Sequence, residues 1–212
     1  MVNFTSFHFI CQQPKSPRVT EKIMDTVPSS AIKLLLFIVF STLFVLISRK
    51  ALKNPKCHGF YRFFVFEGIL FLVLLNFPFW FSEIFSPRQI VSLLLLSASI
   101  LFVILGLQTL RQIGGSEARD EMPENFSFEN TTKLVTGGIY SYVRHPMYSS
   151  LLLLTWGVFF KHLSLVGLGV AVLASLFIVI TVLIEERENI AFFGPAYLQY
   201  QKTTKMFLPF IF

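Results

Sequence analysis

The sequence has few charged residues for its length. Only 14% of the 212 residues are charged, 54% are hydrophobic, and the mean hydropathy is +0.66. This composition argues against a soluble domain, and several apolar runs approach the length that crosses a bilayer. We therefore expect an integral membrane protein with one compact helical domain.

Cysteine and histidine are also scarce. The two cysteines, Cys11 and Cys57, lie on opposite sides of the first apolar run, so a disulfide between them is not expected if that run crosses the membrane. The four histidines are scattered without the spacing of a zinc site, and we predict no bound metal. The net charge of +6 comes from cations that flank apolar runs, which favours membrane topology and lipid headgroups over nucleic acid as the explanation.

Residues 1–30 lack the features of a secretory signal. They have no continuous apolar core and contain Pro14, Pro17 and Pro28, which predicts a disordered or interfacial leader. The start remains open between Met1 and Met24. The C-terminal residues do not form a prenylation box. We expect residues 31–212 to form a single domain.

Five apolar runs predict an all-α, multi-pass transmembrane helical bundle. The runs cover 31–48, 60–81, a stretch within 88–110, the short segment 147–160, and 163–184. Only Lys161 and His162 separate the last two, which predicts a C-terminal helical hairpin, either spanning or tilted and re-entrant.

Lysine and arginine are distributed unequally between the two ends of these runs. With five spans, two thirds of the 18 cations fall on the side that holds the C-terminus. By the positive-inside rule this side is the cytosol, and the polar blocks at 134–148 and 185–197 lie there. We therefore expect a cofactor pocket that faces the cytosol.

The first polar block combines a glycine turn with a helix start. Gly137 and Gly138 permit a tight turn, and Pro146 suits the first turn of the helix that follows Arg144 and His145. The free N–H groups at such a helix start favour an anionic ligand group. In the second block, Glu185 and Glu186 end the last apolar run, where carboxylates require a compensating cation. That cation is either Arg144 or a cationic ligand.

The order of these residues resembles a known family. Leu-Val-Thr-x-Gly-x-Tyr-x-x-x-Arg-His-Pro-x-Tyr, a helical hairpin, Glu-Glu, and Phe-Gly-x-x-Tyr-x-x-Tyr with a late Pro are similar to the isoprenylcysteine carboxyl methyltransferase family, which is related to phospholipid N-methyltransferases. The resemblance covers roughly residues 102–209, which we take as the cofactor-binding core. It implies a membrane enzyme that uses S-adenosyl-L-methionine to methylate a lipid, lipidated or small hydrophobic acceptor.

The resemblance also implies a set of site residues. The cofactor-binding residues carried over from the family are Thr132, Lys133, Leu134, Val135, Tyr140, His145, Pro146, Met147, Tyr148 and Glu185. Asn125 stands where the eukaryotic enzyme has a further contact. The expected catalytic residues are Arg144, His145 and Glu186. The host membrane is expected to be a prokaryotic plasma membrane rather than the endoplasmic reticulum.

One departure from the family concerns the acceptor. Eukaryotic isoprenylcysteine enzymes carry, one turn before the cofactor Glu, an Arg that holds the substrate carboxylate, whereas this chain has Thr181. Thr181 is therefore the predicted substrate-binding residue, for a less anionic acceptor such as an amine, a thiol or a neutral lipid. Two other hypotheses remain: a sterol-type membrane reductase that uses NADPH and shares Arg144-His145-Pro146, and a non-catalytic membrane protein that retains the fold.

Overall fold

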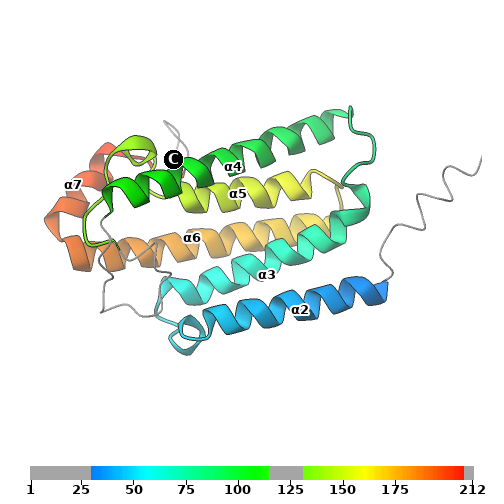
Figure 1. Ribbon diagram of the computed structural model, residues 1–212, viewed down its shortest axis with the longest axis horizontal. Helices are drawn as coiled ribbons and strands as arrows, with labels where there is room; N and C mark the ends of the chain where they lie inside the picture. Colours follow the sequence, from blue (N-terminus) through cyan, green and yellow to red (C-terminus); the bar gives the residue numbers. More distant parts are fainter. Residues whose placement is uncertain (1–29, 115–130, 208–212) are drawn as a thin grey trace, which may run out of the picture.

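The computed structural model describes residues 30–114 and 131–207, and within these ranges the chain is helical. The elements in chain order are α2 (Ser30–Ser48), η1 (Ala51–Lys53), α3 (His58–Asn76), η2 (Phe77–Phe79), α4 (Pro87–Ile113), η3 (Gly138–Ser141), α5 (Pro146–Phe159), α6 (Leu165–Phe193) and α7 (Pro195–Thr203). Figure 1 shows that helices α2 to α6 lie nearly side by side, with α7 at one end. The predicted all-α multi-pass bundle is confirmed.

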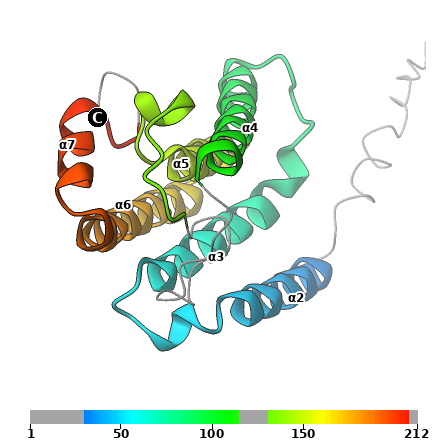
Figure 2. The same cartoon turned by 60° about the vertical axis from the view of Figure 1, so that its left-hand side comes forward.

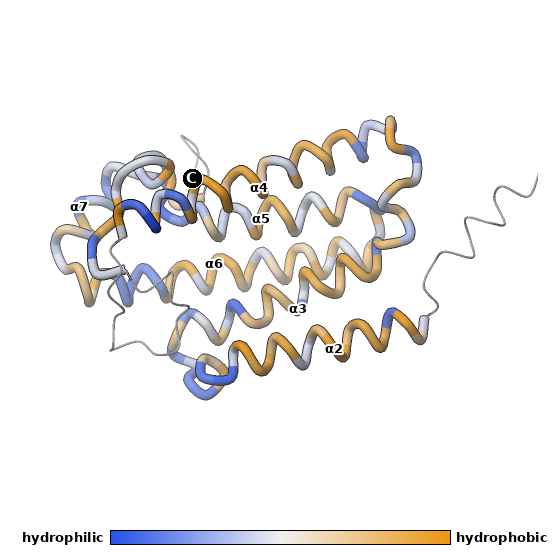
Figure 3. The backbone as a smooth tube through the Cα atoms, viewed as in Figure 1, coloured by the Kyte–Doolittle hydropathy of each residue, from blue (hydrophilic) through white to orange (hydrophobic). Residues whose placement is uncertain are grey.

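Four of the helices are long and apolar enough to cross a membrane: α2, the helical stretch His58–Phe79, α4 and α6. The fifth, α5, has 14 residues and is shorter than a full span, as expected for the fourth run. Hydrophobic residues run along all five helices, and polar residues gather at the bundle ends (Figure 3). Many large apolar side chains point outward, such as Leu93 and Leu94, 60% and 64% exposed, which suits lipid contact rather than water.

The core lies between α3, α5 and α6. One group of buried side chains joins Val65 and Ile69 of α3 to Tyr148 of α5 and to Ile178 and Val182 of α6. A second group, farther from α7, joins Leu72, Val158, Phe159 and Ala171. In contrast, α2 packs chiefly on α3 and lies at the edge of the bundle (Figure 2). Tyr148, in the first turn of α5, therefore packs against both α3 and α6.

Small and hydroxylated residues bring α4 and α5 close together. Ser92 Oγ donates to the carbonyl of Gly157 at 2.7 Å, and Ser99 Oγ donates to the carbonyl of Ser150 at 2.8 Å. Because lipid offers no hydrogen-bond partner, such contacts stabilise helix pairs inside a membrane. A Cβ on Gly157 would stand 2.9 Å from two side-chain atoms of Leu96 and 3.2 Å from its backbone nitrogen.

The last helix continues past its apolar run to Phe193 and Gly194, which the sequence predicts as a helix stop. The apolar run ends at residue 184, but α6 continues through Phe193 and stops at Gly194, where φ is 60°. The polar turns beyond the apolar segment are stabilised by hydrogen bonds to other segments, such as those of Glu186 with Arg144 and Gln201. This extension carries Glu185, Glu186 and Asn189 along one continuous helix toward α7. The predicted leader, residues 1–30, lies outside the described residues except for Ser30.

We expect Gly157→Ala to destabilise the bundle, because the new methyl group meets Leu96 side-chain and backbone atoms. The loss should be about 1–3 kcal/mol, typical of overpacking, and thermal unfolding of the purified protein in detergent measures it. Gly169→Ala is the matched control, because a Cβ there meets no atom within 4 Å. This control should leave stability unchanged or raise it by up to about 1 kcal/mol. Equal effects of the two changes would contradict the close approach of α4 and α5.

Candidate functional site

The glycine turn packs directly on the end of α4. Gly138 has φ of +58°, and a Cβ there would lie 2.7 Å from Oγ1 of Thr109. Both the backbone conformation and the lack of space require glycine at this position. The turn leads through η3, where Tyr140 is buried, to His145 and the start of α5.

Arg144 joins the start of α5 to α6 and α7. Its Nε donates to Oε1 of Glu186 at 2.9 Å, and its Nη1 donates to the carbonyls of Gln201, at 3.2 Å, and Thr204. Gln201 Nε2 also donates to Oε2 of Glu186 at 2.9 Å. Both carboxylate oxygens of Glu186 are thus bonded within the protein, and the residue is only 8% exposed. We name the residues Arg144, Glu186 and Gln201 the clamp.

The chain after α7 returns to the same place. Arg144 N donates to the carbonyl of Lys205 at 2.8 Å, and His145 N donates to the carbonyl of Met206 at 3.2 Å, next to the bridge between Val143 and Lys205. Ser149 Oγ donates to the carbonyl of Phe207 at 2.7 Å. These bonds fix the backbone that precedes α5, so the position of His145 depends on the last described residues of the chain.

His145 lies between the two adjacent carboxylates of α6. Its Nε2 is 3.3 Å from Oε1 of Glu186, and its Nδ1 is 3.6 Å from Oε1 of Glu185. The residue is 4% exposed and is the N-cap of α5, whose first turn receives no bond from a capping side chain. Open N–H groups at a helix start carry partial positive charge and suit an anionic group.

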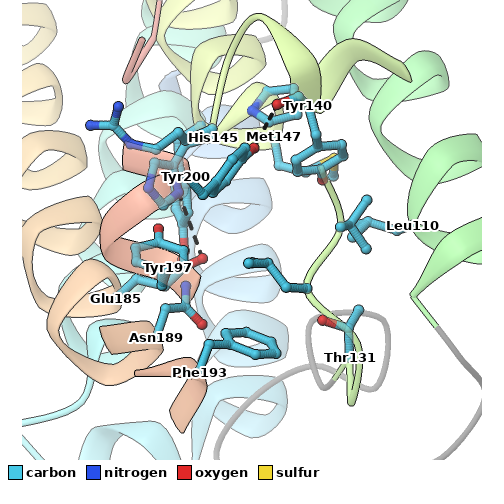
Figure 4. A pocket seen from close by; sticks show the side chains of 15 residues that line it. Leu110, Thr131, Tyr140, His145, Met147, Glu185, Asn189, Phe193, Tyr197 and Tyr200 are labelled. Atoms are coloured by element: carbon cyan, nitrogen blue, oxygen red, sulfur yellow. Dashed lines mark hydrogen bonds and ion pairs between the residues drawn. The ribbon is translucent and has the colours of Figure 1, made fainter. Parts of the chain in front are cut away.

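A cleft opens between the start of α5, the end of α6, and α7. Its empty volume is about 640 Å³, the open mouth included. Figure 4 shows Glu185, Asn189 and Tyr197 on one side, and Leu110 and Thr131 on the other. One wall is therefore mostly polar, and the opposite wall is largely apolar.

Glu185 is the carboxylate that faces this cleft. Its Oε2 is buried and has no hydrogen-bond partner among the described residues, while its Oε1 lies 3.6 Å from Nδ1 of His145. An unbonded carboxylate oxygen out of contact with water is costly, and such a group in a native protein points to a functional role or to a donor from outside the chain.

Two tyrosines of α7 complete the polar wall. Burial raises the pKa of Tyr197, and the nearby charges of Glu185 and Glu186 raise it further. Burial also raises the pKa of Tyr200, whose hydroxyl donates to the carbonyl of Tyr140 at 2.6 Å. Both phenols therefore stay protonated at neutral pH and act as hydrogen-bond donors.

Most of the residues predicted from the sequence meet at the cleft. Those that line it are Leu134, Val135, Tyr140, Arg144, His145, Pro146, Met147, Tyr148 and Glu185. Thr132, Lys133 and Glu186 do not line it. Thr181 is fully buried in α6, and its hydroxyl donates to the carbonyl of Phe177 at 2.7 Å. Asn125 lies outside the described residues.

Sequence reasoning missed six lining residues: Leu110, Thr131, Asn189, Phe193, Tyr197 and Tyr200. Asn189 follows Glu185 by one helical turn and therefore shares its face of α6. Phe193, Tyr197 and Tyr200 belong to the Phe-Gly-x-x-Tyr-x-x-Tyr motif, which was the available signal. Their place in the cleft depends on the reversal of the chain at Gly194.

Comparison with known proteins agrees with this arrangement. Residues 87–195, just over half of the chain, match the sequence profile of the phospholipid methyltransferase family. The chain belongs to this family. The match confirms the predicted kinship with integral membrane methyltransferases, and the matched range holds α4, α5, α6 and most of the cleft.

Two curated relatives are methanethiol S-methyltransferases. The protein from Crocosphaera subtropica (strain ATCC 51142 / BH68) is 30% identical over 79 residues, which cover 37% of this chain and 30% of that protein. The protein from Pseudomonas deceptionensis is 34% identical over 71 residues, which cover 34% of this chain and 26% of that protein. The chain thus aligns with less than a third of the length of either relative. No solved structure matches.

We expect the clamp to be a coupled unit. Arg144→Gln or Glu186→Gln alone should lower the free energy of unfolding by about 3–5 kcal/mol, because each leaves a buried charge without its partner. The double variant should cost less than the sum of the two single changes. Chemical unfolding in detergent, read out by circular dichroism, measures all three variants.

Glu83→Gln is the control, because Glu83 is 69% exposed in its pair with Arg88. This change should lower the free energy of unfolding by at most about 1 kcal/mol. Strict additivity of the Arg144 and Glu186 changes would contradict the clamp.

Proposed function

We propose that this chain is an S-adenosyl-L-methionine-dependent methyltransferase (EC 2.1.1.-) that acts on a lipid, lipidated or small hydrophobic acceptor. The cleft between α5, α6 and α7 is the proposed site for the methyl donor. The observation that carries this proposal is the buried Oε2 of Glu185, which has no hydrogen-bond partner among the described residues and belongs to a side chain that lines the cleft next to the open start of α5.

The chemistry of the lining residues fits the donor. Glu185 would accept from an ammonium or ribose hydroxyl, and the start of α5 would receive a carboxylate. Tyr140 and Tyr148 offer aromatic ring faces that favour a nearby cation. The apolar wall, with Leu110, Leu134 and Met147, suits an uncharged ring system. Thr132 and Lys133, which do not line the cleft, would contribute only through the backbone that leads to Leu134.

Bound S-adenosyl-L-methionine supplies a methyl group on a cationic sulfur, which is already a good leaving group. The protein has to orient the acceptor and keep water out. His145, Tyr148 and Glu185 are the proposed residues in contact with ligand. Arg144 and Glu186 are proposed to act as positioning residues, because the hydrogen bonds of the clamp engage both oxygens of Glu186, and Oε1 of Glu186 also lies 3.3 Å from Nε2 of His145.

The acceptor is proposed to be hydrophobic, because the cleft lies at the end of membrane-spanning helices and has an apolar wall. The relatives described as methanethiol S-methyltransferases support a small neutral acceptor as one form of this proposal. Thr181 stays a predicted substrate-binding residue, although its hydroxyl is bonded within α6. The unequal distribution of Lys and Arg supports a cleft on the cytosolic side. A prokaryotic plasma membrane remains the predicted host membrane.

Glu185→Gln should weaken binding of S-adenosylhomocysteine at least about tenfold, because a neutral amide replaces the carboxylate that accepts the ligand donors. Isothermal titration of the purified protein in detergent measures this affinity. Glu83→Gln is the same chemical change at the other end of the bundle, and it should leave the affinity unchanged. If NADPH binds and S-adenosylhomocysteine does not, the protein is a reductase and the proposal is wrong.

The acceptor can be tested with matched alkyl compounds. Labelled methyl transfer from S-adenosyl-L-methionine should reach an alkyl thiol or amine, or a neutral lipid, more readily than an alkyl carboxylate of equal length. Thr181→Val removes the hydroxyl at nearly constant volume. If Thr181 contacts the acceptor, the variant should raise KM for the acceptor and leave the donor affinity unchanged. An unaltered KM would remove Thr181 from the substrate site.

A further inference from the structure

The turn between α2 and α3 is strongly basic. It carries Arg49, Lys50, Lys53 and Lys56 within eight residues and no acidic residue. All four cationic residues are exposed, and none has an ion pair or side-chain hydrogen bond within the described part of the chain. We name these four residues the basic turn. Their positive charge is available to a ligand from outside the protein.

The backbone of the basic turn is well defined. Lys53 N donates to the carbonyl of Lys50 at 3.2 Å, and Asn54 N donates to the carbonyl of Ala51 at 3.0 Å. Ala51 is 2% exposed, and the buried thiol of Cys57 donates to its carbonyl at 3.7 Å. Because apolar and small residues face inward, the charged side chains between them point outward. Preorganised cations bind an anion with less loss of conformational entropy.

A bond network attaches this turn to the site-bearing helix. His58 N donates to Oε1 of Glu188 at 3.1 Å, and Nδ1 of His58 lies 2.6 Å from Oε2 of Glu188. Glu188 stands on α6 between Glu185 and Asn189, which line the cleft. Figures 1 and 3 show the turn at the same end of the bundle as α7, with its polar residues clustered there. Glu188 is bonded to His58 and makes no ion pair with the four cations of the basic turn within the described residues.

The turn is placed between two apolar helices. α2 ends at Ser48 and α3 begins at His58, and both are candidate membrane spans. A turn that joins two spans lies where hydrocarbon meets water, and the groups at that depth are phospholipid headgroups.

We propose that the basic turn is a binding site for anionic phospholipid headgroups at the cleft end of the bundle. This site does not depend on methyl transfer. The competing explanation is that the cations only direct membrane insertion, which requires no lipid bound to the folded protein.

Lipid selectivity of the reconstituted full-length protein tests the proposal. Spin-labelled phosphatidylglycerol and spin-labelled phosphatidylcholine are compared in phosphatidylcholine bilayers by the fraction of label immobilised at the protein. The wild type should prefer phosphatidylglycerol several-fold at low salt. The double variant Lys50→Gln, Lys53→Gln should lower this preference by about fivefold, or remove it so that both lipids are immobilised equally. The double variant Lys50→Arg, Lys53→Arg keeps the charge and should retain the preference. Raising the salt to about 1 M should remove most of the preference, because the Debye length falls to about 3 Å.

Lys202→Gln with Lys205→Gln is the matched control, because it removes two exposed cations outside the turn. This control should keep the preference for phosphatidylglycerol. An equal loss in both double variants would show that the net charge, and not the turn, attracts the lipid, and would overturn the proposal. A wild type without preference would overturn it as well and would leave insertion as the role of these cations.

Discussion

The buried ion pair between Arg144 and Glu186 holds the site end of the bundle together. Arg144 precedes α5, Glu186 belongs to α6, and the guanidinium also binds the carbonyls of Gln201 and Thr204 at the end of α7. An isolated charge in such a place would be strongly unfavourable, so each group requires the other. Because three segments share this pair, the cleft forms only when all three are in place.

The clamp explains why adjacent residues of one helix have different surroundings. Glu185 and Glu186 are separated by about 100° around the helix axis, so their side chains leave α6 in different directions. Glu186 faces Arg144 and Gln201, and both of its oxygens are bonded. Glu185 faces the cleft and keeps one oxygen unbonded within the described residues. His145 contacts both carboxylates and connects the clamp to the cleft.

The same end of the molecule combines two environments. Long helices with outward apolar side chains bring it to the edge of the lipid, while the extension of α6 and the short helix α7 form a polar wall beyond. The basic turn at this end adds four exposed cations, and it is joined to α6 through His58 and Glu188. A hydrophobic molecule from the membrane and a polar one from water could both reach such a place, which is the requirement for a membrane methyltransferase.

The sequence by itself determined the spans, the hairpin and the family. Continuous apolar runs are long enough to cross a bilayer whatever their neighbours are, and the motifs around His145 and Glu185 are local. The tertiary structure decided which of these residues share the cleft. It extended α6 to Phe193 through contacts with α7, which brought Asn189, Tyr197 and Tyr200 to the site and turned Glu186 toward Arg144. It also placed Thr181 among core side chains, bonded to its own helix. These outcomes depend on the rotation of each helix against its neighbours, which no local pattern of residues specifies.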